Sequence, residues 1–155
     1  MAGHAVTVQR TIQAPVQRVW DVLTDLDRAA QRRSAITEVE ILTDGPYALG
    51  TTWLQTRRML GRSATEEMCV TDNDPLRRTV IEASSSGADY TTTFVLTEAV
   101  DSVTELSVEL RAETADPTTP QKVAWAVVGK AGRTATERAL RADLDDIAAA
   151  ATAPG

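Results

Sequence analysis

Alternating apolar and polar residues dominate the middle of the chain. Six segments between residues 36 and 111 have the two-residue period of a β-strand, and one more lies near the N-terminus. Short turn signals rich in Gly, Pro, Asp and Ser separate the six segments. Connections this short cannot carry a parallel crossover, so the pattern predicts an antiparallel meander. The expected strands span residues 6–12, 36–42, 51–59, 64–71, 76–84, 90–97 and 103–111.

Two other stretches have the spacing of helices. Four apolar residues from Val16 to Leu23 lie at i, i+3, i+4 and i+7 on one helix face. Pro15 suits the first turn of this helix, because its missing N–H would have no partner there. A short helical turn is expected around residues 28–33. A long helix is predicted over residues 121–149, directly after Pro117 and Pro120.

The order of these elements predicts the fold class. A strand, two short helices, six antiparallel strands and a long helix favour an α+β fold of the helix-grip type. In this fold a curved antiparallel sheet wraps around the C-terminal helix and leaves a ligand-sized cavity between them. The whole of residues 1–155 is expected to form a single helix-grip domain, with a frayed tail at residues 148–155.

Symmetric closure of each hairpin predicts which side chains share a face of the sheet. One face then collects mostly apolar residues, and the other collects Glu, Ser and Thr. A slip by one residue would move every following side chain to the opposite face, so the agreement between the turns supports the meander. The expected opposed pairs are Trp53 with Met68, Gln55 with Glu66, Met68 with Thr79, Glu66 with Ile81, Thr79 with Phe94, Ile81 with Thr92, Phe94 with Leu106 and Thr92 with Val108.

Several polar residues fall on the apolar face, where they cost free energy unless they are paired. Two interpretations remain open. In the first, they pair with one another, for example as an Arg57–Glu66 salt bridge near a hairpin end. In the second, they line the cavity and orient a bound molecule. The residues concerned are Gln55, Arg57, Glu66, Thr79, Tyr90 and Thr92.

Composition argues against several classes of protein. The formal net charge of −6 opposes a general affinity for nucleic acid. Cys69 is the only cysteine, so an intrachain disulfide and a Cys-based zinc site are impossible. The longest strongly apolar run, residues 123–128, is too short to span a bilayer, and the first residues do not read as a signal peptide. We therefore expect a cytoplasmic protein without membrane insertion.

The sequence lacks the common catalytic and cofactor motifs. His4 is the only histidine and lies near the N-terminus, which argues against a Ser–His–Asp or Cys–His arrangement. Glu66 and Glu67 are adjacent, but strand alternation sends their carboxylates to opposite faces, so they cannot act as a pair. No phosphate-binding Gly-rich loop precedes a helix. Neither a metal nor a cofactor is therefore expected.

Short motifs spread over nearly the whole chain resemble the START-like superfamily, also called SRPBCC. The superfamily includes polyketide cyclases and dehydrases, the plant pollen-allergen fold and lipid-transfer domains. The resemblance implies the helix-grip fold and an apolar cavity under the long helix, and it carries over no catalytic set. The motifs are Ile12-Gln13-Ala14-Pro15, Val19-Trp20, Leu23-Thr24-Asp25, Val39-Glu40-Ile41-Leu42, Gly45-Pro46, Gly50-Thr51 and the segment from Leu140 to Ile147.

This reading favours two functions and leaves a role in protein interaction as a lesser alternative. The first is binding or carriage of a small, largely apolar or amphipathic molecule, by a monomer or a homodimer. The alternative is a polyketide cyclase, aromatase or dehydrase-like enzyme acting on a poly-β-ketone-like substrate. Here Glu66 would be the base, and Arg57 or a hydroxyl such as that of Tyr90 would steady an enolate oxygen. The expected ligand-binding residues are Trp53, Gln55, Arg57, Glu66, Met68, Ile81, Tyr90, Thr92, Phe94, Val108, Trp125 and Val128.

Overall fold

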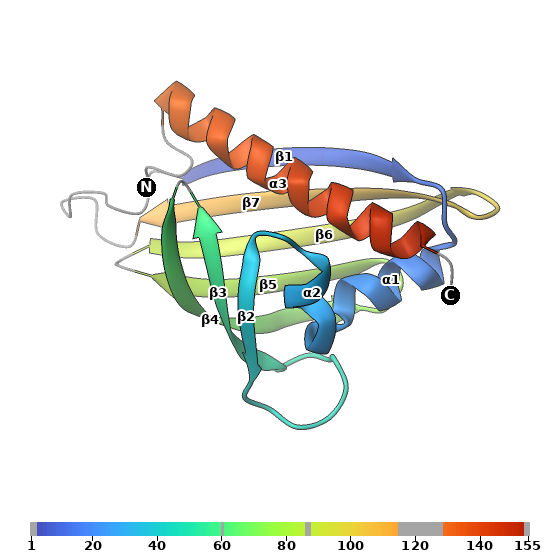
Figure 1. Ribbon diagram of the computed structural model, residues 1–155, viewed down its shortest axis with the longest axis horizontal. Coiled ribbons are helices and arrows are strands. Elements are labelled where there is room, and N and C mark those ends of the chain that lie inside the picture. Colours follow the sequence, from blue (N-terminus) through green and yellow to red (C-terminus); the bar gives the residue numbers. More distant parts are fainter. Residues whose placement is uncertain (1–2, 60, 86–87, 115–128, 154–155) are drawn as a thin grey trace.

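The computed structural model describes residues 3–59, 61–85, 88–114 and 129–153. Within them the strands form a seven-stranded antiparallel sheet of order β1-β7-β6-β5-β4-β3-β2 (Figure 1). The strands are β1 (Gly3–Ile12), β2 (Ile36–Ile41), β3 (Thr52–Met59), β4 (Arg62–Asp74), β5 (Arg78–Ser85), β6 (Ala88–Val100) and β7 (Val103–Thr114). The helical elements are α1 (Val16–Thr24), the 3₁₀ turn η1 (Leu26–Arg28), α2 (Ala29–Arg32) and α3 (Gly129–Thr152). The predicted helix-grip fold is therefore confirmed.

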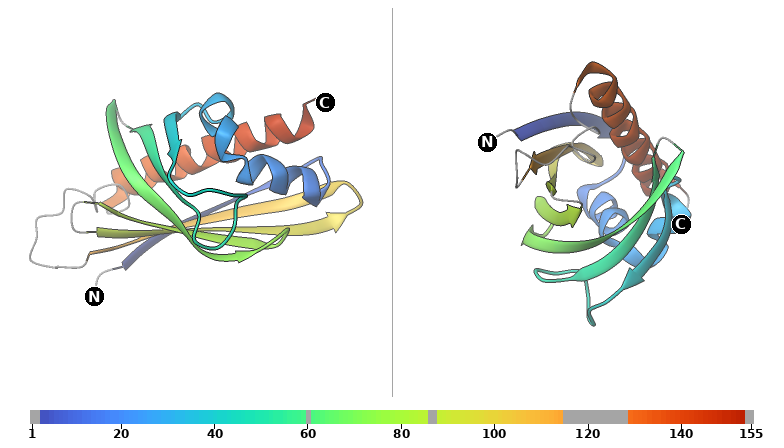
Figure 2. Two further views of the ribbon diagram at one scale, coloured as in Figure 1. Left: turned by 90° about the horizontal axis from the view of Figure 1, so that it is seen from below. Right: turned by 90° about the vertical axis from the view of Figure 1, so that its left-hand side faces the viewer.

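The sheet curls around α3. Figure 2 shows α3 lying across the concave side, with α1 beside the C-terminal part of that helix. Register irregularities interrupt the pairing of β2 with β3, of β4 with β5 and of β6 with β7. Such bulges increase the local twist of a strand, which bends a long antiparallel sheet. One face of the sheet thus contacts helices while the other meets solvent, in agreement with the alternating sequence pattern.

The predicted pairing is correct for β3 with β4 and for β5 with β6, and it is wrong for two other hairpins. Met68 lies opposite Ala83 instead of Thr79, and the predicted partner of Glu66, Ile81, pairs with Val70. The cause is that β4 continues to Asp74, into the expected turn at residues 72–75, and the actual turn lies at residues 75–77. Both predicted pairs are therefore four residues out of register.

The hairpin of β6 and β7 is also longer than expected. Phe94 lies opposite Val108 instead of Leu106, and Thr92 lies opposite Leu110 instead of Val108, a shift of two residues. The actual turn centres on Asp101 and Ser102, and a bulge precedes it. Because both errors are even numbers of residues, each side chain keeps the face that was predicted for it.

The core lies between the sheet and the helices. On α3, Leu144 and Ile147 are almost completely buried, and on α1 Val19 is fully buried. Burial of such a side chain stabilises the fold by roughly 1.5–3 kcal/mol. The core of buried residues comprises Val6, Val8, Ile12, Ala14, Val19, Trp20, Val22, Leu23, Phe94, Leu96, Leu106, Val108, Ala112, Leu140, Leu144, Ile147, Ala148 and Ala151.

The end of α3 differs from the expectation of a frayed tail. The helix continues to Thr152, and Ala148 and Ala151 are buried. Arg18 of α1 donates hydrogen bonds from its guanidinium to the carbonyl oxygens of Ala150 (3.1 Å) and Ala151 (3.3 Å). Carbonyls in a last helical turn lack intrahelical partners, so this arginine caps the helix and fixes it to α1. The frayed tail is therefore wrong as far as Thr152.

Two further expectations concern the start of the long helix and the absence of a membrane-spanning segment. The predicted first turns of the long helix, residues 121–128, lie outside them, and with these Trp125 and Val128. Over the parts of the chain that the structure describes, no helix is both long enough and apolar enough to cross a membrane.

Candidate functional site

A cavity of about 410 Å³ lies between the concave face of the sheet and α3. This volume is in the range of small-molecule sites. Ten of the twelve residues predicted to bind a ligand line its walls, because the inward positions of β3 to β7 alternate as expected. These ten are Trp53, Gln55, Arg57, Glu66, Met68, Ile81, Tyr90, Thr92, Phe94 and Val108.

The remaining lining residues lie mainly on helices and in a loop. The alternating pattern of the strands does not predict which of these residues contact the sheet. The segment from α1 to α2 and the loop after β2 close one side, and α3 forms the roof. Arg62, Ser63 and Ala64 at the start of β4 are exposed, so the mouth of the cavity lies near the β3–β4 hairpin. The additional residues are Leu23, Leu26, Ala29, Arg33, Tyr47, Arg62, Ser63, Ala64, Ala83, Leu110, Thr136, Ala139, Leu140 and Asp143.

A buried charge cluster stands at the side of the cavity formed by α3. Asp143 Oδ2 accepts hydrogen bonds from Arg33 Nη2 (3.1 Å) and Arg57 Nη2 (3.0 Å). The Asp143 side chain is 5% exposed, and those of Arg33 and Arg57 are 15% and 22% exposed. We call these three residues the Arg–Asp–Arg cluster.

This cluster argues against the Arg57–Glu66 salt bridge, which was one of the two interpretations that the sequence left open. Among the described residues Arg57 forms its ion pair with Asp143, because its side chain points across the cavity to α3 and not along the sheet to β4. The pairing also sets the charge of Asp143. Burial by itself would raise the pKa of this carboxyl, but the neighbouring Arg33 and Arg57 outweigh burial and hold the pKa below its ordinary value.

Helical geometry explains why Asp143 faces inward. It lies three residues after Leu140 and four before Ile147, and both of these are buried. Residues at these spacings share one face of a helix, so the sequence places a carboxylate within an apolar stripe. That is a detectable signal for a functional or paired residue, and sequence reasoning missed it.

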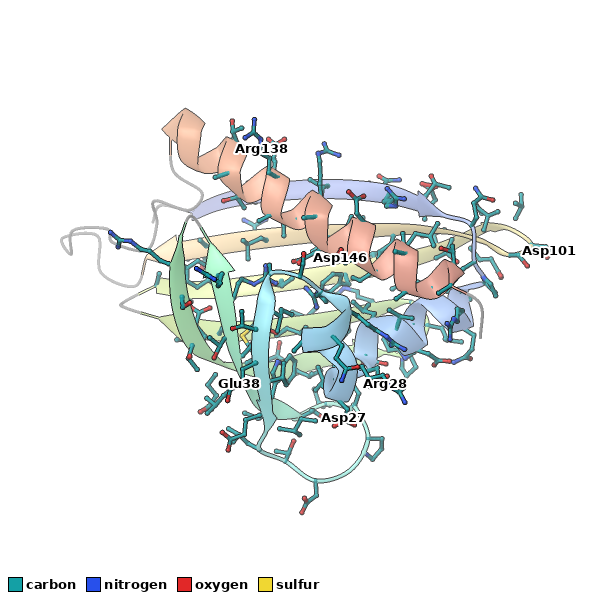
Figure 3. The ribbon with its side chains drawn as sticks, viewed as in Figure 1. Asp27, Arg28, Glu38, Asp101, Arg138 and Asp146 are labelled. Carbon is teal, nitrogen blue, oxygen red and sulfur yellow. The ribbon has the colours of Figure 1, made fainter. Side chains whose placement is uncertain are left out.

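The link between α2 and β2 is fixed to α3 next to this cluster. Ser34 donates hydrogen bonds from its backbone N–H (2.9 Å) and its hydroxyl (3.0 Å) to Asp146 Oδ2. Figure 3 shows Asp146 on α3 where the helix passes the turn that follows α2. Arg33, one residue earlier, is thereby held in position to reach Asp143.

An aromatic group forms the wall of the cavity near α1. The ring of Tyr47 meets Trp20 edge to face at 6.4 Å between centroids and lies 6.3 Å from Trp53. The Tyr47 hydroxyl shares a hydrogen bond of 2.7 Å with Thr79 Oγ1, which satisfies this buried threonine. Burial raises the pKa of Tyr47 to about 12, so its hydroxyl stays protonated at neutral pH. The sequence pattern did not reveal Tyr47, because a loop has no periodicity from which the direction of a side chain could be predicted.

Glu66 and Tyr90 share the sheet side of the cavity. Both are half-buried, on β4 and β6 respectively, with the small Ala83 on β5 between those strands. Burial, and to a smaller extent the negative charge of Glu66, raise the pKa of Tyr90 to about 12. Trp53 Nε1 donates to Gln55 Oε1 at 3.3 Å, so this indole N–H has a partner at the cavity wall. Within the described residues, no group of three or more His, Cys, Asp and Glu could hold a metal ion.

Fold and cavity together define a helix-grip protein with an internal binding space. The sequence matches the family described as "Polyketide cyclase / dehydrase and lipid transport" over residues 3–152, and the chain belongs to this family. The START-like resemblance of the sequence motifs is thereby confirmed. No curated protein matched the chain.

Solved structures of several proteins are similar to this one. The Zhui aromatase/cyclase from Streptomyces sp. R1128 has a TM-score of 0.77 and 19% identity over 97% of this chain and 94% of that chain. A START superfamily protein from Mycobacterium smegmatis has a TM-score of 0.74 and 14% identity over 94% of both chains. Truncated norcoclaurine synthase from Thalictrum flavum has a TM-score of 0.74 and 13% identity over 99% of this chain and 96% of that chain. At such identities the likeness shows the fold alone.

Proposed function

We propose that the chain binds and carries a small, largely apolar molecule in the cavity under α3. The observation that supports this most directly is the cavity itself, about 410 Å³ in volume, whose walls combine apolar side chains with convergent polar groups. Preformed cavities of this kind typically bury most of a small ligand, and the polar groups fix its orientation. The family's description, which names lipid transport beside cyclase and dehydrase activity, is compatible with a carrier.

Filling the cavity is expected to abolish this binding. Ala139 lines the cavity from α3, whereas Ala142 on the same helix is exposed. In Ala139→Phe the ring occupies space that the ligand needs, so the affinity for the neutral fluorescent probe N-phenyl-1-naphthylamine should fall at least about tenfold. Titration of the probe by fluorescence measures this effect.

The matched control is Ala142→Phe, which adds the same ring on the solvent side and should bind the probe as the wild type does. Circular dichroism of both variants confirms that they remain folded. If Ala139→Phe binds the probe as tightly as the control, the probe does not occupy the cavity and the proposal fails. Native mass spectrometry of freshly purified protein would in addition weigh any co-purified ligand.

A second candidate is a cyclase or dehydrase acting on a poly-β-ketone-like substrate. The observation that favours it is the presence of Glu66, Tyr90 and Arg57 on the walls of one cavity. Glu66 would remove a proton from a carbon beside a carbonyl group. Arg57 or the protonated Tyr90 hydroxyl would then stabilise the enolate oxygen.

The variant Glu66→Gln separates the two candidates. If Glu66 is a base, turnover of a poly-β-ketone mimic should fall by about 100-fold or more, while the affinity for the mimic changes little, because the amide keeps the shape and loses the basicity. Glu67→Gln, on the opposite face of β4, is the control and should retain activity. Wild-type protein that binds the mimic without converting it would support the carrier and contradict the enzyme.

A further inference from the structure

We propose that the ligand of this cavity carries one anionic group, such as a carboxylate, and that Arg33 and Arg57 bind it. This inference rests on the proposed binding function and specifies the chemical class of the ligand. The apolar part of the molecule would occupy the space between the sheet and α3. Its charged end would lie at the Arg–Asp–Arg cluster, where two guanidinium groups share a single carboxylate.

The charge balance of the cavity supports an anionic ligand. Among the described residues, the lining contains Arg33, Arg57 and Arg62, and its acidic residues are Glu66 and Asp143, so the formal charge of this part is +1. The whole chain has a formal charge of −6. A positively charged lining in a negatively charged protein is a local feature that the composition does not require. Coulomb attraction is strengthened inside a protein, because the surroundings screen charge less than water does.

The hydrogen bonds of the cluster are incomplete on the arginine side and on the aspartate side, so a ligand group can still bind there. A guanidinium group has five N–H donors, and within the described residues Arg33 and Arg57 reach Asp143 through Nη2 alone. Arg33 Nε and Asp143 Oδ1 are both buried and have no hydrogen-bond partner there. A carboxylate accepts two such N–H groups side by side. A carboxylate of the ligand would therefore fit the guanidinium N–H groups that do not bond to Asp143.

A purely structural role for the cluster is the competing explanation. In that case the two arginines only join the α2–β2 link and β3 to α3, and their removal should affect all ligands alike. The distinction therefore requires two ligands of nearly the same shape that differ in charge. N-phenyl-1-naphthylamine is neutral, and 1-anilinonaphthalene-8-sulfonate is the same ring system with one sulfonate. Both report an apolar environment by their fluorescence.

Arg57→Gln is the first variant. The affinity for the anionic dye should fall by about 10- to 100-fold, which is the range for a lost charge-assisted hydrogen bond, while the affinity for the neutral dye stays within about twofold. Arg58→Gln is the matched control, because Arg58 is the next residue of β3, exposed on the other face, and its replacement changes the net charge equally. This control should bind both dyes as the wild type does.

Asp143→Asn is the second variant, and it should change the affinity for the anionic dye in the opposite direction. Without the carboxylate both arginines lose their counter-ion, and the bound anion takes its place. The affinity for the anionic dye should therefore rise by about tenfold with little change for the neutral dye. Retained near-ultraviolet circular dichroism verifies that the core is intact. A rise for both dyes would indicate loosened packing and contradict the proposal.

The outcomes separate this inference from the proposed function. If the wild type binds neither dye, the cavity does not bind apolar molecules of this size, and both proposals fail. Suppose that the wild type binds both dyes and that Arg57→Gln lowers the affinity for both equally, or for neither. The cavity then binds apolar molecules, but the arginines do not form an anion site. Selective loss of the anionic dye in Arg57→Gln, together with selective gain in Asp143→Asn, supports the inference.

Discussion

Asp143→Asn is expected to lower the free energy of unfolding by about 3 kcal/mol at pH 7, as is usual when one partner of a buried ion pair is removed. The asparagine keeps the shape of the side chain and leaves Arg33 and Arg57 without a counter-ion. Asp145→Asn on the same helix is the control. Asp145 pairs with Arg10 on the surface, where the two side chains are 62% and 45% exposed, so its loss should cost no more than about 1 kcal/mol. Urea unfolding measures both variants.

The difference between wild type and Asp143→Asn should depend on pH in a defined direction. The pKa of Asp143 in the folded chain lies below the ordinary value of 3.8. A carboxyl of this kind contributes its full stabilisation above its unfolded pKa and loses it as the pH falls through the folded value. The difference should therefore be constant at neutral pH and shrink below about pH 3.8. A difference that grows on acidification would contradict the arrangement.

The strand pattern predicted the fold and most of the cavity wall because both depend on a period of two. Trp53 and Met68 on β3 and β4 were placed correctly, and so were the inward positions of β5 to β7. The pairings of Met68 and Phe94 were wrong by four and two residues, because the turns that follow these strands lie further along the chain than expected and each hairpin contains a bulge. A register error of an even number of residues leaves each side chain on its predicted face, and only an error of an odd number moves it to the opposite face.

The Arg–Asp–Arg cluster depends instead on tertiary packing. Arg33 and Asp143 are separated by 110 positions, and they meet only because α2 packs against α3. The strand pattern placed Arg57 inside the cavity but could not show that its partner comes from a helix. Tyr47 belongs to a loop, where the direction of a side chain follows from the particular turn and not from a period. The polar chemistry of the site was therefore harder to predict than its apolar wall.

Trp53 is a large side chain of the cavity wall that is almost completely buried. Its side chain is 1% exposed, its ring lies 6.3 Å from that of Tyr47, and its indole N–H donates to Gln55 at 3.3 Å. Trp53→Ala removes a large buried side chain and leaves a space that β3 and β4 cannot collapse to fill, because they are fixed by their backbone hydrogen bonds. The expected loss in the free energy of unfolding is about 3–5 kcal/mol.

Two further variants make this prediction specific. Trp53→Phe keeps most of the apolar contact and loses the indole N–H, so its cost should be about 1–2 kcal/mol. Leu54→Ala, at the next position of the same strand, lies on the outer face and is half-buried, so its cost should be clearly smaller than that of Trp53→Ala. Chemical denaturation of the three variants at one pH gives the order. If Leu54→Ala proves as costly as Trp53→Ala, the concave face does not hold the core that stabilises the sheet. The cavity would then lie beside the core instead of within it.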